Sequence, residues 1–454
     1  MRAEDLLDAI GKVNDTLIEQ ATKKESTPYL RWFSLAASLL LVIGLGFFVL
    51  KYLPFGEDPV TIPTESTTGI EPTTGQLPTE NGTIELPTEQ VMEYKVAMIT
   101  DYGDITDQSF NQTTYEACLA FAEANGVDFE YYKPQTNDTA ARVAMTEKAI
   151  AEGYNVIVMP GYAFGMTLAE IAPLYPEVKF IALDVTAGDI LENAVALAGE
   201  EYSWNPADYN LADYFDMSNV YCAIYQEELA GYMAGYAAVK LGYTKLGFLG
   251  GMAVPAVIRY GYGYIQGADA AAGEIGAEVS LCFAYGNQFY GDADITARMD
   301  TWYADGTEVV FACGGGIYTA AAEAAQKING KVIGVDTDQA PAIDALYGDE
   351  ITVTSAMKGL YPTTIDLLTE IILNDNWSAS VGRIETLGLV SGMNPEENYV
   401  QIPMDSTQWS ESFTPEDYLA LVNDIYSGTV IVSNDISVEP TTANITVDYQ
   451  GNIK

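Results

Sequence analysis

The sequence predicts an α/β protein built as two doubly wound, Rossmann-like lobes that follow an N-terminal single transmembrane helix. Short, continuously apolar runs alternate with helical stretches from residue 94 onward, which is typical of parallel sheets covered on both faces. About ten such units in roughly 350 residues are too many for one ordinary open sheet, so two lobes fit better than one. A TIM barrel is the alternative, but the long irregular stretch at 187–219 interrupts the alternation that a barrel requires.

The transmembrane helix is predicted from residues 32–50, WFSLAASLLLVIGLGFFVL, which carry no charge and approach the ~20 residues that cross a bilayer. A secretory signal peptide is the alternative. It fits less well because the first 30 residues contain six acidic side chains and no A-x-A site follows the apolar run. Five Lys and Arg residues precede the run, and only Lys51 lies between it and Lys95. The positive-inside rule therefore predicts a cytoplasmic N-terminus, with residues 54–454 outside the cell.

Composition shifts predict the rest of the domain organisation. Apolar residues recur at helical spacing within residues 1–30, so this segment is expected to be an amphipathic helix that lies on the membrane or binds a cytoplasmic partner. Residues 59–90 are rich in Thr, Pro and Glu and bury too little surface to fold, which predicts a spacer. The expected parts are a cytoplasmic amphipathic segment (1–30), a transmembrane anchor (31–53), a Thr/Pro-rich linker (54–93), lobe 1 (94–219), lobe 2 (220–350), and crossover segments completing both lobes with a C-terminal tail (351–454).

Composition also excludes several classes of function. The chain carries 20 Lys and Arg against 64 Asp and Glu, a net charge of -44, so binding to nucleic acid is not expected. It has no histidine, which excludes Ser-His-Asp and Cys-His catalysis and histidine-ligated metals. The four cysteines form no CxxC pair and no GxxxxGK[ST] loop is present, so we expect neither a metal nor a cofactor. Whether Cys282 and Cys313 pair stays open.

Within the globular part, each expected strand is an apolar run bounded by loop residues, and each expected helix follows from apolar residues at helical spacing. Strands are expected at 95–100, 155–161, 179–185, 245–251, 308–316 and 331–338. Helices are expected at about 108–125, 139–153, 226–241, 255–273 and 317–328.

Polar residues and glycines recur where these strands end. Asp101 follows the first strand, Asp184 and Asp336 close two others, Lys358 follows the run ITVTSAM, and a Gly-Gly-Gly run at 314–316 follows VVFAC. One such Asp alone is usually a turn or helix-cap residue. Because ligands of open α/β sheets meet the carboxyl ends of strands, the recurrence predicts one shared ligand site. Its carboxylates favour a neutral or cationic ligand with hydroxyl groups, and aromatic residues suit a planar ring.

Several blocks resemble the basic membrane protein (BMP) family, the nucleoside-binding lipoproteins of bacterial ABC transporters. They are ITDYGDITDQSFNQTTYEA (99–117), PGYAFGMTLAEIAPLYPEVKFIALD (160–184), KLGFLGGMAVPAVIRYGYGYIQGA (245–268), VVFACGGGIYTAA (309–321) and VTSAMKG (353–359). The resemblance extends over about residues 94–435. It implies a type I periplasmic-binding-protein fold, in which two lobes close on a purine or pyrimidine nucleoside, and an ABC permease as partner.

The resemblance also implies roles for individual residues. Matching positions assign Phe110 to stacking on the base, with Tyr260 as the candidate for a second stacking aromatic and Phe289 as the alternative. The remaining matches to ligand-binding positions are Asp101, Asn111 and Asp184 from the first lobe and Gly316, Asp336 and Lys358 from the second.

The implied function is that of a membrane-anchored extracellular solute-binding protein, and not an enzyme, in a bacterium of Gram-positive type. It captures a nucleoside, with a purine favoured, for an ABC importer. The family normally carries a lipobox cysteine, whereas the first cysteine here is Cys118 and a transmembrane anchor is predicted instead. This departure keeps open a sensor that signals through residues 1–30. An extracellular nucleoside hydrolase is a third possibility, but Asp101, Asp104 and Asp107 are better explained as loop and helix-cap groups.

Overall fold

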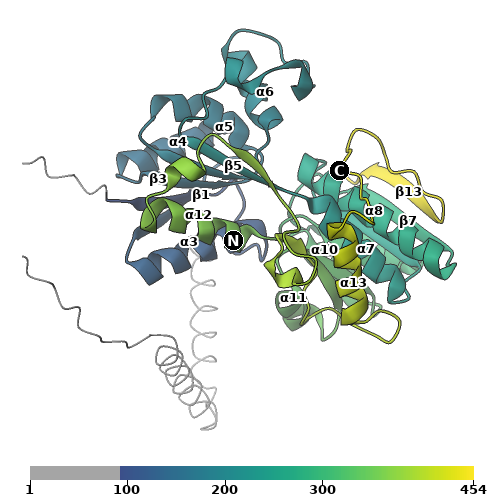
Figure 1. Cartoon of the computed structure of the whole chain (residues 1–454). Coiled ribbons are helices and arrows are strands. Elements are labelled where there is room, and N and C mark those ends of the chain that lie inside the picture. The colour runs from purple at the N-terminus through teal and green to yellow at the C-terminus, as the bar shows by residue number, and fades with distance from the viewer. Residues whose placement is uncertain (1–92) are drawn as a thin grey trace, which may run out of the picture. The chain divides into compact units, whose positions relative to one another are not determined.

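The computed structural model describes residues 93–454, and it confirms two α/β lobes (Figure 1). The predicted cytoplasmic segment and transmembrane anchor, and all but the last residue of the predicted linker, lie outside the described residues. Between residues 93 and 454, no helix combines the length and the apolar character that a membrane crossing needs.

The first lobe is a six-stranded parallel sheet in the order β11-β5-β4-β3-β1-β2. Buried residues alternate along its strands between two apolar clusters, one beneath α4, α5 and α6 and the other beneath α3 and α12. Its strands are β1 (Lys95–Ile99), β2 (Asp128–Tyr132), β3 (Val156–Pro160), β4 (Lys179–Leu183), β5 (Val220–Tyr225) and β11 (Ile384–Leu387). Its helices are α3 (Phe110–Asn125), α4 (Thr139–Ala151), α5 (Phe164–Ile171), α6 (Ala187–Leu197) and α12 (Leu360–Leu368).

The second lobe is a seven-stranded sheet in the order β12-β10-β9-β8-β6-β7-β13, parallel except for β12. One face packs against α9, α10 and α11, and the other against α7, α8 and α13. Its strands are β6 (Lys245–Gly250), β7 (Val279–Tyr285), β8 (Val309–Cys313), β9 (Lys331–Asp336), β10 (Thr352–Lys358), β12 (Val400–Gln401) and β13 (Ile445–Asn452). Its helices are α7 (Glu227–Lys240), α8 (Pro255–Ile275), α9 (Ala293–Ala304), α10 (Tyr318–Gln326), α11 (Ala340–Tyr347) and α13 (Pro415–Tyr426).

The chain passes between the lobes three times: from β5 to α7, from β10 to α12, and from β11 to β12. The predicted boundary between residues 219 and 220 therefore differs from the structure, because β5 pairs with β4 and β11 in the first sheet. The apolar run of β5 continues almost directly into α7, and no glycine or proline marks the point where the chain changes lobe.

The stretch 187–219 is less irregular than we expected. Its first part forms α6, which begins with a capping box in which the Thr186 and Asp189 side chains bond each other's backbone N–H groups. Only residues 198–219 lack regular structure, apart from two 3-10 turns. In this segment the Tyr202 and Tyr209 rings lie 5.2 Å apart, and Trp204 is 75% exposed.

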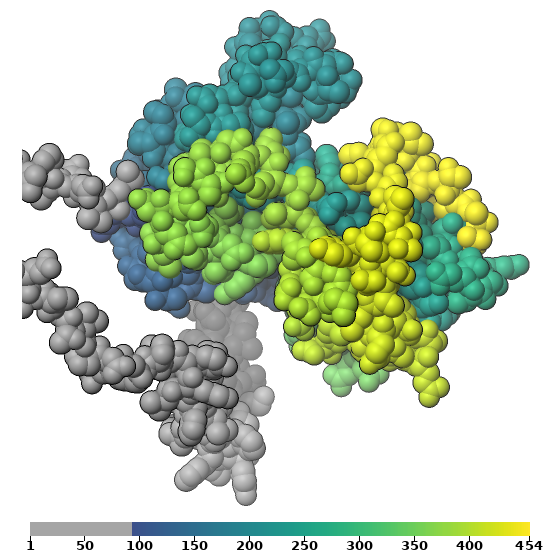
Figure 2. All heavy atoms as spheres, viewed as in Figure 1, coloured from purple at the N-terminus to yellow at the C-terminus, as the bar shows by residue number. Residues whose placement is uncertain are grey.

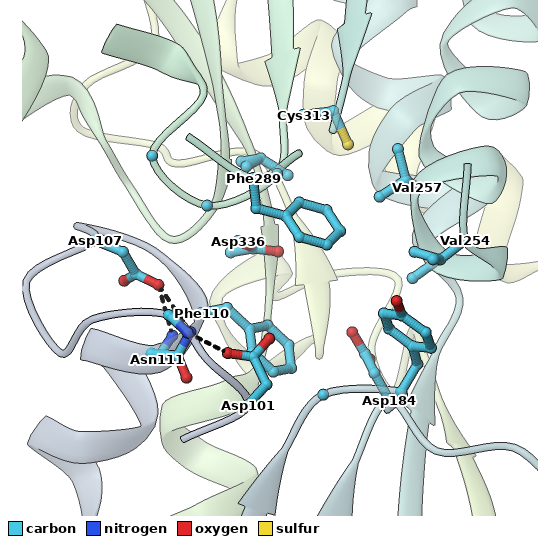
Figure 3. Close-up of a pocket in the computed structure, with 18 of the residues that line it drawn as sticks. Asp101, Asp107, Phe110, Asn111, Asp184, Val254, Val257, Phe289, Cys313 and Asp336 are labelled. Atoms are coloured by element: carbon cyan, nitrogen blue, oxygen red, sulfur yellow. Dashed lines mark hydrogen bonds between the residues drawn. The ribbon is translucent and has the colours of Figure 1, made fainter. Parts of the chain in front are cut away.

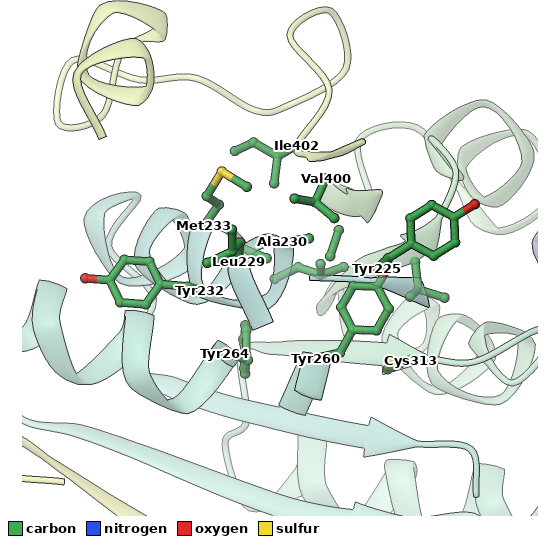
Figure 4. Packing of buried hydrophobic residues seen from close by; sticks show 14 of the residues in the cluster. Tyr225, Leu229, Ala230, Tyr232, Met233, Tyr260, Tyr264, Cys313, Val400 and Ile402 are labelled. Atoms are coloured by element: carbon green, nitrogen blue, oxygen red, sulfur yellow. The ribbon is translucent and has the colours of Figure 1, made fainter. Parts of the chain in front are cut away.

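Helices α7 and α8 pack unusually closely because glycines line their contact. A Cβ atom on Gly231 or Gly235 of α7 would lie 2.1 Å from a carbonyl oxygen of α8, and one on Gly263 or Gly267 would lie 2.0 Å from a carbonyl oxygen of α7. Large buried side chains fill the space on either side of this contact. Figure 4 shows them as Leu229, Tyr232 and Met233 of α7 with Tyr260 and Tyr264 of α8.

This packing predicts that Gly263→Ala destabilises the protein, although alanine favours helix. The added methyl group meets the backbone carbonyl of Glu228, which cannot rotate away, so the helices must separate. We expect a loss of about 2 kcal/mol in the free energy of unfolding, measured by urea denaturation. Gly273→Ala in the same helix is the control, because its methyl group meets only the end of the Asn444 side chain, at 2.7 Å. Equal stability of the two variants would contradict the prediction.

Candidate ligand-binding site

The carboxyl ends of both sheets face a cavity of about 470 Å³ between the lobes (Figure 3). In Figure 3, Asp101, Asp107, Phe110 and Asn111 lie on one side and Phe289 and Cys313 on the other. All of the site residues predicted from the sequence line this cavity: Asp101, Phe110, Asn111, Asp184, Tyr260, Phe289, Gly316, Asp336 and Lys358. The size is within the range of small-molecule sites.

On the side of the first lobe, a tight turn after β1 holds Asp101. Its Oδ1 accepts hydrogen bonds from the N–H groups of Tyr102 at 2.6 Å and Gly103 at 2.7 Å. Burial raises the pKa of Asp101, and these hydrogen bonds offset only part of that effect. Both donors bond the same oxygen, so they leave the Oδ2 of Asp101 able to accept a hydrogen bond from a ligand.

Asp107 orients Asn111 at the start of α3. The Asp107 Oδ2 accepts from both the backbone N–H and the side-chain Nδ2 of Asn111, each at 3.1 Å. The side-chain nitrogen of Asn111 therefore faces the Asp107 carboxylate, and the buried Oδ1 of Asn111 has no hydrogen-bond partner within residues 93–454. Burial raises the pKa of Asp107 to about 6, although four N–H groups of the α3 turn lower it.

The centre of the cavity is a buried ion cluster around Lys358, the last residue of β10. Its Nζ donates to the Oδ2 of Asp184, and it lies 3.5 Å from Asp336 Oδ1 and 3.7 Å from Glu227 Oε1. The Lys358 side chain is only 3% exposed. Burial lowers the pKa of Lys358, but the three facing carboxylates outweigh burial and the net pKa is raised. Burial raises the pKa of Asp184 to about 7, and Lys358 offsets that in part.

Several residues in and beside this cavity have a backbone in the left-handed region. Asp184 has φ of 60° and Asp336 has φ of 66°, which is the left-handed region that residues with a Cβ rarely adopt. Gln108 and Asn287, at φ of 54° and 59°, precede the segments that carry Phe110 and Phe289. Such conformations persist where the surrounding structure needs a side chain in one direction, and they cluster at functional sites.

Phe289 and Tyr260, the two candidates for the second stacking aromatic, differ in how far their rings reach into the cavity. The Phe289 ring points into the cavity in Figure 3 and packs on Gly251 and Gly314, where a Cβ would come within 2.3 and 2.7 Å of it. Tyr260 is 1% exposed, with its ring edge-on to Phe311 at 6.0 Å, so it forms the floor of the cavity. Phe110 lies beneath the Lys358 ammonium, 4.5 Å from ring centroid to Nζ. The geometry therefore favours Phe289 as the aromatic opposite Phe110.

Sequence reasoning missed two charged residues of the site. Glu227, the first residue of α7, is fully buried, and its Oε2 accepts from the Nε of Arg259 at 2.6 Å. Arg259 lines the cavity from the first turns of α8. Glu227 lies two residues after the end of β5, so the expectation that ligand-binding residues follow the carboxyl ends of strands could have predicted it. Arg259 lies inside a helical stretch, where periodicity does not reveal which side chains reach a site.

All four cysteines of the sequence are free thiols, which answers the question left open about Cys282 and Cys313. Cys313 lines the cavity at the end of β8. Within residues 93–454, no group of three or more Cys, Asp or Glu side chains is arranged to hold a metal ion.

Two parallel-sheet lobes, three chain crossings and a cavity at the strand ends define a substrate-binding protein of the periplasmic-binding type. The chain belongs to the Bmp family, described as ABC transporter substrate-binding protein PnrA-like, whose sequence profile matches residues 94–434. This confirms the resemblance described above. The family consists of substrate-binding proteins for ABC transporters and not of enzymes, so a small-molecule ligand and an ABC permease are the partners that it implies.

Relatives with described names agree with this assignment. The chain is 26% identical over 260 residues to the "ABC transporter nucleoside-binding protein BmpA" of Lactococcus lactis, covering 54% of this chain and 65% of that protein. It is 24% identical to an uncharacterized lipoprotein of Pyrococcus furiosus, covering 73% and 78%, and 24% identical to basic membrane protein B of Borreliella afzelii, covering 66% and 79%. The match to the Lactococcus protein thus spans less than two thirds of its length.

Solved structures support the fold. A solute-binding protein of an ABC transporter system from Aeropyrum pernix matches with a TM-score of 0.54 and 20% identity over 76% of this chain and 88% of that one. A second, from Conexibacter woesei, matches with a TM-score of 0.53 and 20% identity over 75% and 99%.

The ion cluster predicts that Lys358→Met is strongly destabilising in a pH-dependent way. Without the ammonium, three buried carboxylates face one another, and we expect a loss of about 3 kcal/mol in the free energy of unfolding at pH 7.5. The pKa of Asp184 is already raised to about 7 and rises further in the variant. The folded variant therefore takes up its proton at a pH above 7, whereas wild type does so only near pH 7, so the deficit relative to wild type shrinks as pH falls from 9 toward 7.

Urea denaturation at several pH values measures this deficit. Lys327→Met is the control, because its ion pair with Asp300 is at the surface and contributes at most about 1 kcal/mol. A deficit that is equally large at pH 7 and pH 9 would show that Lys358 stabilises the protein by packing and not by its charge.

Proposed function

We propose that the chain captures a nucleoside in the cavity between its lobes and delivers it to an ABC importer. The observation that carries the proposal is the arrangement of two phenylalanines, Phe110 and Phe289, around a wall of paired charges. An aromatic pair binds a planar base, and paired charges suit the hydroxyl groups of a sugar. The Lactococcus relative is named as a nucleoside-binding protein.

The sugar would lie against the ion cluster. The Oδ1 of Asp184 is buried and has no hydrogen-bond partner among the described residues, so it can accept a hydrogen bond from a hydroxyl group. Asp336 and Lys358 are paired with each other at 3.5 Å and present both an acceptor and a donor. Lys358 and Arg259 are the two basic residues among the described residues that line the cavity, and both already form ion pairs with carboxylates. Neither positive charge is therefore available to bind a phosphate group. This favours a nucleoside over a nucleotide.

The base would contact Asp101 and Asn111. The two backbone donors leave the Oδ2 of Asp101 available, and an acceptor at this position suits the N–H groups on the edge of a purine. The turn that holds Asp101 and the α3 start that holds Asn111 are fixed by hydrogen bonds within the first lobe. The base site is therefore preorganised before the ligand enters, which lowers the entropy lost on binding.

Contacts that join the lobes beside the cavity support a closing motion around the ligand. The Ser109 hydroxyl donates to Asp336 Oδ2 at 2.5 Å, and Gln339 Nε2 donates to the carbonyl of Gln108 at 2.9 Å. Ser109 and Gln108 belong to the first lobe and their partners to the second. Closure around a small ligand excludes water and strengthens each polar contact.

Calorimetric titration of the full-length chain with a panel of purine and pyrimidine nucleosides tests this proposal. We expect at least one dissociation constant below about 100 μM. Phe289→Leu should weaken binding about tenfold through lost stacking, whereas Phe129→Leu on the edge strand β2 should not change it. If every nucleoside binds more weakly than about 100 μM, the ligand belongs to another class.

We further propose that residues 31–53 anchor the protein in the cell membrane, with residues 54–454 outside. This rests on the apolar, charge-free run at 32–50 and on the basic residues that precede it. The alternative of a sensor depends on residues 1–30, and no contact among the described residues favours it.

Deletion of residues 31–53 should release the chain from the membrane fraction, and protease added to intact cells should digest the globular part of the wild-type protein. Immunoblotting of the fractions measures both effects. Retention of the deletion variant in the membrane fraction would show that another segment or modification anchors the chain.

A further inference from the structure

The C-terminal segment 435–454 lies beyond the match to the family and forms an added strand, β13, at the edge of the second sheet. It pairs in parallel with β7, from Ile445 opposite Val279 to Asn452 opposite Tyr285. In Figure 2 the C-terminal residues, in yellow, lie along the outer side of this lobe. The segment therefore runs in the same direction as β7, toward the end of the sheet where the ligand cavity lies.

The start and middle of this strand are held by specific contacts. Asp269 of α8 accepts hydrogen bonds through Oδ1 from the N–H groups of Ala443 at 2.9 Å and Asn444 at 2.7 Å. Further along, the Oε1 of Gln450 accepts from the indole N–H of Trp302 at 3.0 Å. These contacts determine where the last residues of the segment lie.

The end of the segment reaches the loop 286–292, which connects β7 with α9. The N–H of Ile453 donates to the carbonyl of Tyr285 at 2.8 Å. The Lys454 ammonium pairs with Asp292 and lies 3.5 Å from the Oε1 of Gln288. The hydrogen bond from Lys454 lowers the pKa of Asp292 to about 2.

Gln288 and Asp292 are the residues that shape this loop. The Nε2 of Gln288 donates to both the carbonyl of Tyr290 and the Oδ2 of Asp292, each at 2.9 Å. Phe289 lies within the turn that these two hydrogen bonds close. Its backbone carbonyl accepts a hydrogen bond from the N–H of Gly316 at 2.9 Å. Lys454 thus contacts both ends of the turn that directs the Phe289 ring into the cavity.

We propose that the C-terminal strand braces the ligand-facing loop 286–292, and that Lys454 is a positioning residue that acts on ligand affinity through Phe289. This rests on the proposed function, because it takes Phe289 to be the aromatic that stacks on the base. Lys454 itself does not line the cavity.

The experiment is a double-mutant cycle on the full-length chain, with nucleoside affinity measured by calorimetry. Lys454→Ala should weaken binding about threefold to fivefold, the range of one partly exposed charged contact, and Lys454→Arg should restore it. In a Phe289→Leu background, Lys454→Ala should cause no further loss. Lys327→Ala, which breaks the surface ion pair with Asp300, is the matched control and should leave affinity unchanged.

Hydrogen exchange of the ligand-free protein supplies a readout that does not depend on the ligand. The N–H groups of Gly286 and Asn287 donate to the carbonyls of Gly250 and Gly251, and their exchange should be faster in Lys454→Ala than in wild type. If wild type binds no nucleoside, the proposed function fails and exchange alone decides whether the strand braces the loop. The positioning role is overturned by unchanged affinity in Lys454→Ala when wild type binds, by an equal loss in both backgrounds, or by unchanged exchange.

Discussion

A single buried ammonium group, that of Lys358, holds together the part of the protein where the two lobes meet. Asp184 comes from the first lobe, Asp336 and Glu227 come from the second, and all three carboxylates lie within 4 Å of it. None of the four groups could be buried alone, because an unpaired charge in the interior costs several kcal/mol. The lysine therefore lets carboxylates of both lobes face one cavity. Six aspartates and two basic residues, Lys358 and Arg259, are among the described residues that line the cavity, so its wall is rich in hydrogen-bond acceptors.

The sequence was most informative at the ends of strands. Asp101, Asp184, Asp336 and Lys358 could be predicted because each follows a fully buried apolar strand, and the carboxyl ends of parallel strands meet at one edge. The rule is topological and needs no knowledge of side-chain direction. It held for both lobes, even though their sheets have different numbers of strands.

Side-chain direction on helices and edge strands was harder to predict. Tyr260 lies in a helix, and spacing alone does not tell whether its ring faces the sheet or the cavity, so the sequence could not decide between Tyr260 and Phe289. The sequence did not predict strand β2, because it lies at a sheet edge and alternates exposed with partly buried residues instead of forming an apolar run. The lobe boundary was misplaced at β5 because the crossing into α7 occupies one residue, Gln226, and carries no turn signal.

The four unpaired cysteines have a consequence for how the protein is made. Cys118, Cys222 and Cys313 are buried, and burial raises the pKa of each thiol, so they remain protonated and unreactive at neutral pH. Apolar packing and the ion cluster supply the stability that small secreted domains take from disulfides. Folding of residues 93–454 therefore requires no oxidant and no disulfide isomerase.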